Sequence, residues 1–259
     1  MIPDSYEDFK TKVFQLTKID LSSYKERQMK RRIDSLITRH SVPTYMEYVE
    51  KLRTDKKMFD EFVTFLTINV SEFYRNPDQW TLLEKDILPQ ILAKNKKPRI
   101  WSAACSTGDE PYSLVMLLAK YIPMRDISII ATDIDEQILE KAKAGLYNVK
   151  SLKALPAEFV DKYFIKINDT SYKIKDEVKK CVEFKHHNLL KDEYPKGCDM
   201  IVCRNVVIYF TEEAKEVIYR KFSESLIPGG VLFVGSTEQI IQPGSVGFES
   251  MRAFFYRKK

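Results

Sequence analysis

The hydrophobic pattern of this chain changes its period near residue 95, and this change constrains the fold more than any other sequence feature. Before residue 93, apolar residues recur at the spacing of one helix face. Two such sets are Met29, Ile33, Leu36 and Ile37, and Phe59, Phe62, Val63 and Leu66. After the basic stretch 94–98, short apolar runs alternate with amphipathic segments. The pattern predicts an all-helical N-terminal domain followed by an α/β domain.

The short apolar runs after residue 98 are predicted strands, and the amphipathic segments between them are predicted helices. Strands are expected at 99–102, 127–131, 181–184, 200–203 and 231–234. Helices are expected at 111–121, 135–144 and 211–226. Alternating strands and helices favour βαβ units, and so predict a mostly parallel sheet with helices on both faces.

One segment interrupts this alternation. Two runs of alternating polarity, 163–167 and 171–174, flank Asn168-Asp169 and predict a small β-hairpin inserted into the α/β domain. The aromatic segment 248–257 is expected to form an edge hairpin beside the strand at 231. The predicted domains are 1–75 (helical), 76–95 (a linking helical segment) and 96–259 (α/β), with the β-insertion at about 150–180.

Composition excludes several classes of protein. The chain has 259 residues, 44% of them hydrophobic, and no apolar stretch approaches the roughly 18 residues of a membrane span. The start, MIPDSYEDFK, does not resemble a signal peptide, so we expect a soluble cytoplasmic protein without membrane insertion. Its four cysteines form no C-x-x-C pair and are predicted to be reduced core thiols. The net charge of +5 permits an acidic partner but does not favour a polyanion binder.

The segment after the first predicted strand is the first candidate binding loop. Small residues fill 102–108, and the acidic pair Asp109-Glu110 follows. With Gly108 as its one glycine, the loop lacks the G-x-G-x-x-G pattern of dinucleotide sites, and two carboxylates would repel a pyrophosphate. The loop therefore favours a ligand with an amine or sulfonium charge. The alternative is a tight turn whose acids complement the helix dipole.

Polar residues follow the next three predicted strands. Asp133 lies twenty-five residues beyond Gly108, near the spacing of about 20 at which an acid binds a ribose diol; alternatively, it caps a helix, as we expect of Asp135. Asn188 and Asn205 follow the third and fourth strands, where amides could read an adenine edge or simply form turns. The three histidines have no Cys or acid at metal-ligand spacing, so no metal site is predicted.

Four ordered motifs together resemble the chemotaxis receptor methyltransferases of the CheR type. They are 69–75 (NVSEFYR), 102–113 (SAACSTGDEPYS), 132–135 (TDID) and 203–210 (CRNVVIYF). The resemblance covers nearly the whole chain. It implies a helical domain and a Rossmann-like methyltransferase domain with an inserted antiparallel β-subdomain. It also implies that S-adenosylmethionine donates a methyl group to glutamate side chains on the cytoplasmic helical domains of chemoreceptors, leaving S-adenosylhomocysteine and a methyl ester.

The resemblance assigns roles residue by residue. It implies that Glu110 binds the methionine amino group and Asp133 the ribose, and that Arg75 and Tyr209 act in catalysis. The residues it places around the cofactor are Asn69, Ser71, Arg75, Glu110, Asp133, Asn188, Leu189, Asn205 and Val206. Ser71 and Asp109 stand where Thr and Glu are common in the family, and both keep the functional group.

The short, glycine-free loop 166–171 departs from the longer, glycine-rich loop of members that dock on a receptor's C-terminal pentapeptide. This departure predicts receptor binding without that tether. We also expect the protein to be a monomer.

The segment 18–39 holds seven basic residues against three acids. Arg27 and Arg31 lie on the face opposite its apolar face. The face that carries these arginines is either exposed to solvent alone or a contact for acidic receptor helices. Arg27, Lys30 and Arg31 are the predicted substrate-binding residues. Two rival functions are a methyltransferase acting on nucleic acid, which would need aromatic stacking beside the basic helix, and a non-catalytic S-adenosylmethionine sensor. We expect no nucleic-acid partner.

Overall fold

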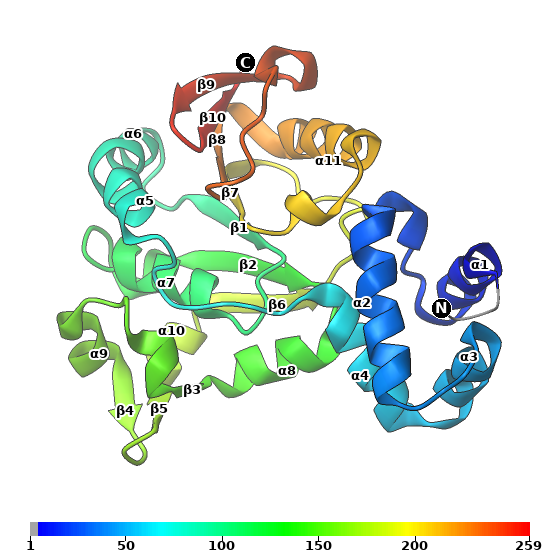
Figure 1. Cartoon of the computed structure of the whole chain (residues 1–259). Coiled ribbons are helices and arrows are strands. Elements are labelled where there is room, and N and C mark those ends of the chain that lie inside the picture. The colour runs from blue at the N-terminus through cyan, green and yellow to red at the C-terminus, as the bar shows by residue number, and fades with distance from the viewer. Residues whose placement is uncertain (1–4) are drawn as a thin grey trace. The chain divides into compact units, whose positions relative to one another are not determined.

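A computed structural model describes residues 5–259 (Figure 1). Its contacts divide the chain into two compact units. The helical unit comprises the described residues up to Asn69 together with Tyr209–Lys215. The α/β unit comprises Val70–Ile208 and Glu216–Lys259. The division between the units at residue 69 therefore falls six residues before the predicted one.

The helical unit confirms the period-3.6 prediction. Its elements are α1 (Tyr6–Thr17), the 3-10 turn η1 (Leu21–Ser23), α2 (Glu26–Arg39), α3 (Tyr45–Thr54) and α4 (Lys56–Thr67). The side chains of Ser5, Thr44 and Asp55 cap α1, α3 and α4 by accepting backbone N–H groups. The predicted apolar face of α2 is buried along its whole length, whereas Phe59 and Val63 on α4 are only partly buried. Rings of α1, α3 and α4 meet in the core, where the Phe9 ring lies 4.9 Å from that of Tyr45 and 6.2 Å from that of Phe62.

A short segment from the second half of the chain folds with the helical unit. The backbone N–H of Lys25 donates to the Tyr209 carbonyl at 2.9 Å, and the N–H of Thr211 donates to the Ser23 carbonyl at 2.9 Å. The rings of Tyr24 and Phe210 lie 4.8 Å apart. Tyr209 therefore belongs by its contacts to the helical unit, which the sequence pattern did not indicate.

The α/β unit contains a seven-stranded sheet in the order β6-β2-β1-β7-β8-β10-β9 (Figure 1). The strands are β1 (Arg99–Ala103), β2 (Ser128–Asp133), β6 (Val182–His186), β7 (Cys198–Cys203), β8 (Leu226–Val234), β9 (Phe248–Arg252) and β10 (Phe255–Lys258). The first five strands in that order pair in parallel, and β10 is antiparallel to both β8 and β9. Both the parallel sheet and the C-terminal hairpin are confirmed. The strand order reverses beside β1, the place where open α/β sheets bind ligands.

Helices cover both faces of this sheet. They are α5 (Pro77–Leu82), the π-helical turn η2 (Leu83–Ile87), α6 (Leu88–Lys94), α7 (Asp109–Leu118), α8 (Glu136–Ala144) and α11 (Glu212–Ser225). On one face, Trp80 of α5 meets Phe233 of β8 at 6.3 Å; on the other, Trp101 of β1 meets Phe222 of α11 at 5.5 Å. The segment 76–95, expected to link two domains, thus packs into the core of the α/β unit.

The predicted β-insertion is present and larger than expected. It holds β3 (Leu146–Asn148), β4 (Phe164–Lys166) and β5 (Ser171–Ile174) in the antiparallel order β3-β5-β4. The hairpin of β4 and β5 is the predicted one. The accompanying helices are η4 (Val149–Leu152), α9 (Ala157–Tyr163) and α10 (Asp176–Lys179). The three-residue β3 was missed because it follows α8 directly and is too short to show alternation.

Three further 3-10 turns complete the chain: η3 (Met124–Asp126), η5 (Val207–Tyr209) and η6 (Pro243–Val246). All four cysteines are free and buried, as predicted. Among residues 5–259, no helix has the length and apolar character needed to cross a membrane.

Candidate active site

The loop between β1 and α7 brings the backbone close to the carboxyl edge of the sheet. Ala104 and Ser106 adopt positive φ of 59° and 50°, and Gly108 has φ of 85°. A Cβ on Gly108 would lie 3.0 Å from the Ala142 Cβ and 3.2 Å from the Tyr112 ring. Both its conformation and its packing therefore require glycine. The Ser106 hydroxyl is buried and has no hydrogen-bond partner among the described residues.

Asp133 lies at the end of β2, facing this loop. Its Oδ2 accepts the backbone N–H of Ser106 at 2.8 Å, and its Oδ1 accepts that of Asp135 at 3.1 Å. Burial of the carboxyl raises its pKa to about 6, although these backbone donors oppose the shift. Asp135, as predicted, caps α8 through the N–H groups of Gln137 and Ile138. Asp133 is therefore not the helix cap but a buried acceptor joined to the binding loop.

The acidic pair at the start of α7 is turned inward. Glu110 accepts a hydrogen bond from the Ser102 hydroxyl at 2.8 Å, and its Oε2 lies 3.7 Å from Nη1 of Arg204. Burial raises the pKa of Glu110, and the Arg204 charge is the largest effect that opposes the rise. Asp109 is 1% exposed and accepts a hydrogen bond from the Thr107 hydroxyl. These acids thus do more than complement the helix dipole.

The ends of β6 and β7 complete the row of polar groups. The backbone N–H of His187 donates to the Asp133 carbonyl at 2.9 Å, which aligns the ends of β6 and β2. Asn188 is buried and uses its Oδ1 to accept the N–H of Leu190 at 2.9 Å, so it serves as a turn residue. Asn205 has φ of 62°, and its buried Oδ1 finds no partner in residues 5–259.

Glu238, which the sequence analysis missed, holds the loop after β7. It is 4% exposed, and its carboxylate accepts the N–H groups of Asn205 at 2.6 Å, Gly235 at 2.8 Å and Ile208 at 3.4 Å. Because Glu238 follows the end of β8, the strand-end rule that singled out Asp133 could also have found it.

The segment before α5 contributes Arg75 to the α/β unit. Its guanidinium donates to the Val70 carbonyl at 3.1 Å, and its own carbonyl accepts the indole N–H of Trp80 at 3.0 Å. Tyr74 and Asn76, on either side, have positive φ of 53° and 60°. The turn is thus anchored at both its backbone and its side chain.

The two units divide the predicted site residues between them. The α/β unit holds Ser71, Arg75, Glu110, Asp133, Asn188, Leu189, Asn205 and Val206. The helical unit holds Asn69, whose amide donates to the Thr67 hydroxyl at 2.8 Å, and Tyr209. Within the part of the chain that the structure describes, no cluster of three or more His, Cys, Asp or Glu side chains could hold a metal ion.

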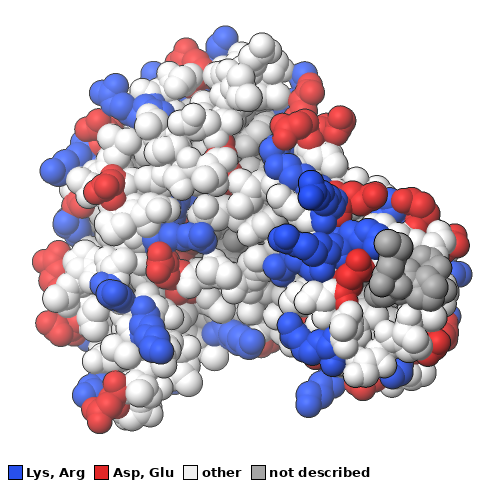
Figure 2. All heavy atoms as spheres, in the orientation of Figure 1, with Lys and Arg blue, Asp and Glu red and all other residues white. Residues whose placement is uncertain are grey.

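Basic side chains gather over α2, as Figure 2 shows. Arg27 and Arg31 are exposed, as predicted for the face opposite the apolar stripe. Lys30 differs from them, because its ammonium lies 3.0 Å from the Asp34 carboxylate and donates to the Tyr45 hydroxyl at 2.8 Å. The geometry therefore favours Arg27 and Arg31 over Lys30 as contacts for a partner.

A hollow of about 220 Å³ lies within the helical unit beside Tyr209. Its lining residues are Lys25, Gln28, Met29, Arg31, Arg32, Ile68 and Tyr209. Every charged residue among them is a cation. Arg32 also donates to the Phe65 carbonyl at 2.7 Å, which fixes its guanidinium. Sequence reasoning missed Lys25 and Arg32 as site residues because Tyr209 is remote from them along the chain.

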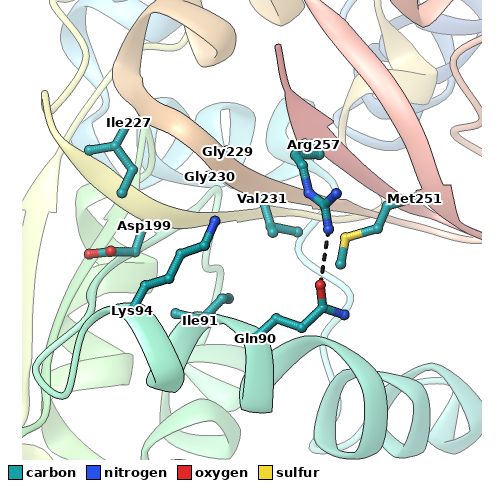
Figure 3. A pocket seen from close by; sticks show the side chains of 10 residues that line it. All are labelled: Gln90, Ile91, Lys94, Asp199, Ile227, Gly229, Gly230, Val231, Met251 and Arg257. Atoms are coloured by element: carbon teal, nitrogen blue, oxygen red, sulfur yellow. Dashed lines mark hydrogen bonds between the residues drawn. The ribbon is translucent and has the colours of Figure 1, made fainter.

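A second hollow, in the α/β unit, lies between α6 and the start of β8 (Figure 3). Gln90 and Arg257 are joined across it by a hydrogen bond of 3.0 Å, and Gly229 and Gly230 form part of its wall. It adjoins the amino ends of β7 and β8. It is therefore at the opposite edge of the sheet from Asp133 and is not part of the candidate site.

Comparison with known proteins matches both units. The family described as "CheR methyltransferase, all-alpha domain" matches residues 4–67, and "CheR methyltransferase, SAM binding domain" matches residues 69–254. A "Chemotaxis protein methyltransferase" of Listeria monocytogenes is 44% identical over 262 residues, covering 100% of both chains. Proteins of the same description from Borreliella burgdorferi and Salmonella typhimurium are 32% and 31% identical, covering 93% and 87% of this chain and 89% and 80% of theirs.

Proposed function

This chain belongs to the CheR methyltransferase family, and from that premise we propose that it methylates glutamate side chains on the cytoplasmic helices of chemoreceptors. It is an S-adenosylmethionine-dependent methyltransferase of chemotaxis, and S-adenosylmethionine is its cofactor. The observation that carries the proposal is the row of buried ligand groups at the carboxyl ends of β1, β2 and β7.

The residues at this edge fit an adenosyl ligand. The Asp133 carboxylate accepts the backbone N–H groups of Ser106 and Asp135, and a ribose diol would supply two further O–H donors to it. The Ser106 hydroxyl and the Asn205 Oδ1 are buried without a partner among the described residues, so each could pair with a polar group of the nucleoside. We propose that Asn188, Leu189 and Val206 complete the nucleoside pocket.

We propose that Glu110 binds the amino group of the methionine portion. Its side chain is 14% exposed at the start of α7, where its neighbour in sequence, Asp109, is buried, and Asp133 is buried at the end of β2. A buried acid-rich edge favours a cationic ligand over an anionic one, because each carboxylate lowers the energy of a nearby positive charge. The bound cofactor supplies an electrophilic methyl group on a sulfonium.

The transfer needs no general base. A glutamate with an ordinary pKa of about 4.3 is already a carboxylate at neutral pH. With the cofactor held by Glu110 and Asp133, one substrate carboxylate oxygen would bond to the methyl carbon as the carbon–sulfur bond breaks, and the electrons of that bond would stay on sulfur. Opposite charges cancel along this path, so the protein contributes mainly by positioning the groups and excluding water.

We propose that Tyr209 and Arg75 orient the substrate carboxylate. Support for Tyr209 is its place in the hollow where the charged groups, Lys25, Arg31 and Arg32, are all cations. Such a hollow attracts a carboxylate, and a phenol hydroxyl can donate a hydrogen bond to it. Support for Arg75 is its anchored turn in the α/β unit, and Asn69 and Ser71 complete the proposed set in the same stretch of chain.

Receptor recognition is proposed to use the exposed arginines of α2. Arg27 and Arg31 are the members of the predicted set whose side chains are exposed, and acidic receptor helices would complement them. The tip of the β4–β5 hairpin is short, with Asn168 closing the turn through Thr170, which supports binding without a pentapeptide tether. We propose that the protein acts as a monomer in the cytoplasm.

The deciding experiment incubates the protein with methyl-labelled S-adenosylmethionine and purified cytoplasmic fragments of chemoreceptors. The expected result is label on the receptor that is released by mild base, because methyl esters hydrolyse and N-methyl groups do not. A receptor fragment with its acceptor glutamates changed to alanine is the control. Base-stable label, or label on added nucleic acid instead, would overturn the proposal, and saturable cofactor binding without transfer would favour a sensor.

A further inference from the structure

Arg204, directly after β7, is a buried cation that joins three segments of the α/β unit. It is 8% exposed, and its Nη2 donates to the Arg75 carbonyl and to the Gln79 Oε1, both at 2.7 Å. Its Nη1 lies 3.7 Å from the Glu110 carboxylate. Its guanidinium also lies 4.7 Å from the centre of the Phe233 ring. A charge buried this deeply is retained only where its partners compensate for the lost solvation.

We propose that Arg204 is a positioning residue that holds Glu110 and the Arg75 turn in place for the amino-acid end of S-adenosylmethionine. This inference rests on the proposed function, in which Glu110 binds the amino group. Arg204 itself need not touch the cofactor, because its guanidinium contacts Glu110 and the segment that carries Arg75.

Arg204 holds the backbone at Arg75. Tyr74 and Asn76, on the two sides of Arg75, have left-handed φ. Asparagine adopts this conformation readily, but a bulky residue such as Tyr74 adopts it only when its surroundings impose it. The Arg75 carbonyl accepts two donors, the Arg204 guanidinium and the Trp80 indole. Arg204 also donates to the Asn76 Oδ1 at 3.3 Å. Loss of the guanidinium would leave the turn with the indole as its remaining donor at that carbonyl.

Arg204 also acts on the charge of Glu110. The groups that act on this carboxyl are Arg204 after β7, the Ser102 hydroxyl on β1, Glu238 after β8 and Arg75 before α5. Burial and Glu238 favour the protonated acid, whereas Arg204, Ser102 and Arg75 favour the carboxylate, with Arg204 first among them. Without Arg204, Glu110 would take up a proton at higher pH. A protonated Glu110 would no longer attract an ammonium group.

A role in packing alone leads to a different expectation. If Arg204 only filled space between Trp80 and Phe233, its loss would weaken the binding of every adenosine derivative to a similar degree. If it positions Glu110, the loss would fall on ligands that carry the amino-acid portion. The two roles are therefore separated by comparing two nucleosides.

The experiment measures binding of S-adenosylhomocysteine and of 5′-methylthioadenosine, which lacks the amino-acid portion, by titration calorimetry between pH 6 and 8. The ratio compared is the affinity for S-adenosylhomocysteine divided by the affinity for 5′-methylthioadenosine. For Arg204→Met, we expect this ratio to fall by about 10-fold to 100-fold, the scale of a lost charge-assisted contact. We expect that fall to be largest at pH 6 and to recover partly with rising pH, and Arg204→Lys to restore part of the ratio. An equal loss for both ligands, or an unchanged ratio, would overturn the inference.

Two further variants keep the outcome decisive. If Arg204→Met does not fold, Gln79→Leu removes one acceptor of the guanidinium and keeps its charge. We expect this variant to lower the same ratio by about 2-fold to 10-fold, and an unchanged ratio would contradict the inference. Glu110→Gln tests the proposed function separately. If Glu110→Gln leaves the ratio unchanged, the amino-group assignment fails; if only Glu110→Gln lowers it, Arg204 has no positioning role.

Discussion

Nucleoside binding should depend on pH through Asp133. Burial raises the pKa of this carboxyl to about 6, whereas a ribose diol donates its hydroxyl hydrogens and so prefers the ionised form. Both carboxylate oxygens already accept backbone N–H groups, from Ser106 and Asp135. Protonation would place a hydrogen on one of these crowded oxygens and remove an acceptor. A nucleoside should therefore bind the protein with Asp133 ionised.

The expected magnitude follows from that pKa. With a pKa of about 6, roughly one free molecule in eleven is ionised at pH 5 and ten in eleven at pH 7, so affinity should rise about 10-fold between them. The raised pKa of Asp133 also makes the stability of the fold depend on pH. Because the folded pKa lies above the ordinary 3.8, Asp133 stabilises the unliganded fold below pH 4, and about 3 kcal/mol of this is lost as pH rises through 6.

The assay is calorimetric titration of 5′-methylthioadenosine, whose lack of an amino group removes any contribution from Glu110. Asp133→Asn should bind more weakly at pH 7, by about 1.5 to 3 kcal/mol for the lost charge-assisted bonds, and should lose the pH dependence. Asp78→Asn, which changes an exposed acid of the same unit, is the matched control and should keep it. The reasoning is refuted if the wild-type affinity is flat from pH 5 to 7, or if folded Asp133→Asn keeps the slope.

Further predictions concern the substrate side and the binding loop. Charge reversal at Arg27 and Arg31 should slow receptor methylation and leave cofactor affinity unchanged. The effect should be largest at low salt, because salt screens surface charges over about 10 Å at 0.1 M. Wild-type methylation rates of this variant at low salt would show that the two arginines face only solvent. Tyr209→Phe should lower kcat by about 10-fold to 1000-fold in single-turnover assays with cofactor affinity nearly unchanged, and a wild-type rate would remove Tyr209 from the site. Arg75→Ala should lower kcat more than Tyr209→Phe does, because it removes a fixed positive charge. A smaller loss of kcat in Arg75→Ala than in Tyr209→Phe would contradict this prediction. Gly108→Ala should weaken the fold by more than 1 kcal/mol in chemical denaturation, because a Cβ there is crowded and φ is 85°; equal stability would show that the loop relaxes.

The layout of the sheet was predictable because burial on both faces makes parallel strands read as continuous apolar runs. All of β7 is buried, and the continuous apolar run 200–203 predicted most of it, whereas its first two residues, Cys198 and the polar Asp199, were not predicted. The three-residue β3 carries no such signal, since Leu146 and Asn148 are exposed and only Tyr147 is buried. Its pairing with β5 depends on the fold of the whole insertion, which periodicity does not report.

Positions in the candidate site were predictable wherever a residue's place at the end of its own strand decided them. Asp133 was predicted to end a strand, and the structure places it there, buried at the end of β2. The partners that hold such residues were not found, because their contacts join distant segments. Glu238 reaches Asn205 across 33 residues, and Arg204 reaches Arg75 across 129. Sequence spacing carries no signal at such separations.

Net charge explains little about the ligands of this chain, because it averages two opposite local populations. In the α/β unit, Asp109, Asp133 and Glu238 are buried at the sheet edge, where low dielectric strengthens their effect on a bound cation. In the helical unit, Arg27 and Arg31 are exposed, where solvent and salt weaken their effect on a partner. A cofactor held by the buried acids should therefore bind with little dependence on ionic strength, whereas receptor association through α2 should weaken steadily as salt is added. The +5 of the whole chain is a sum over both populations and predicts neither behaviour.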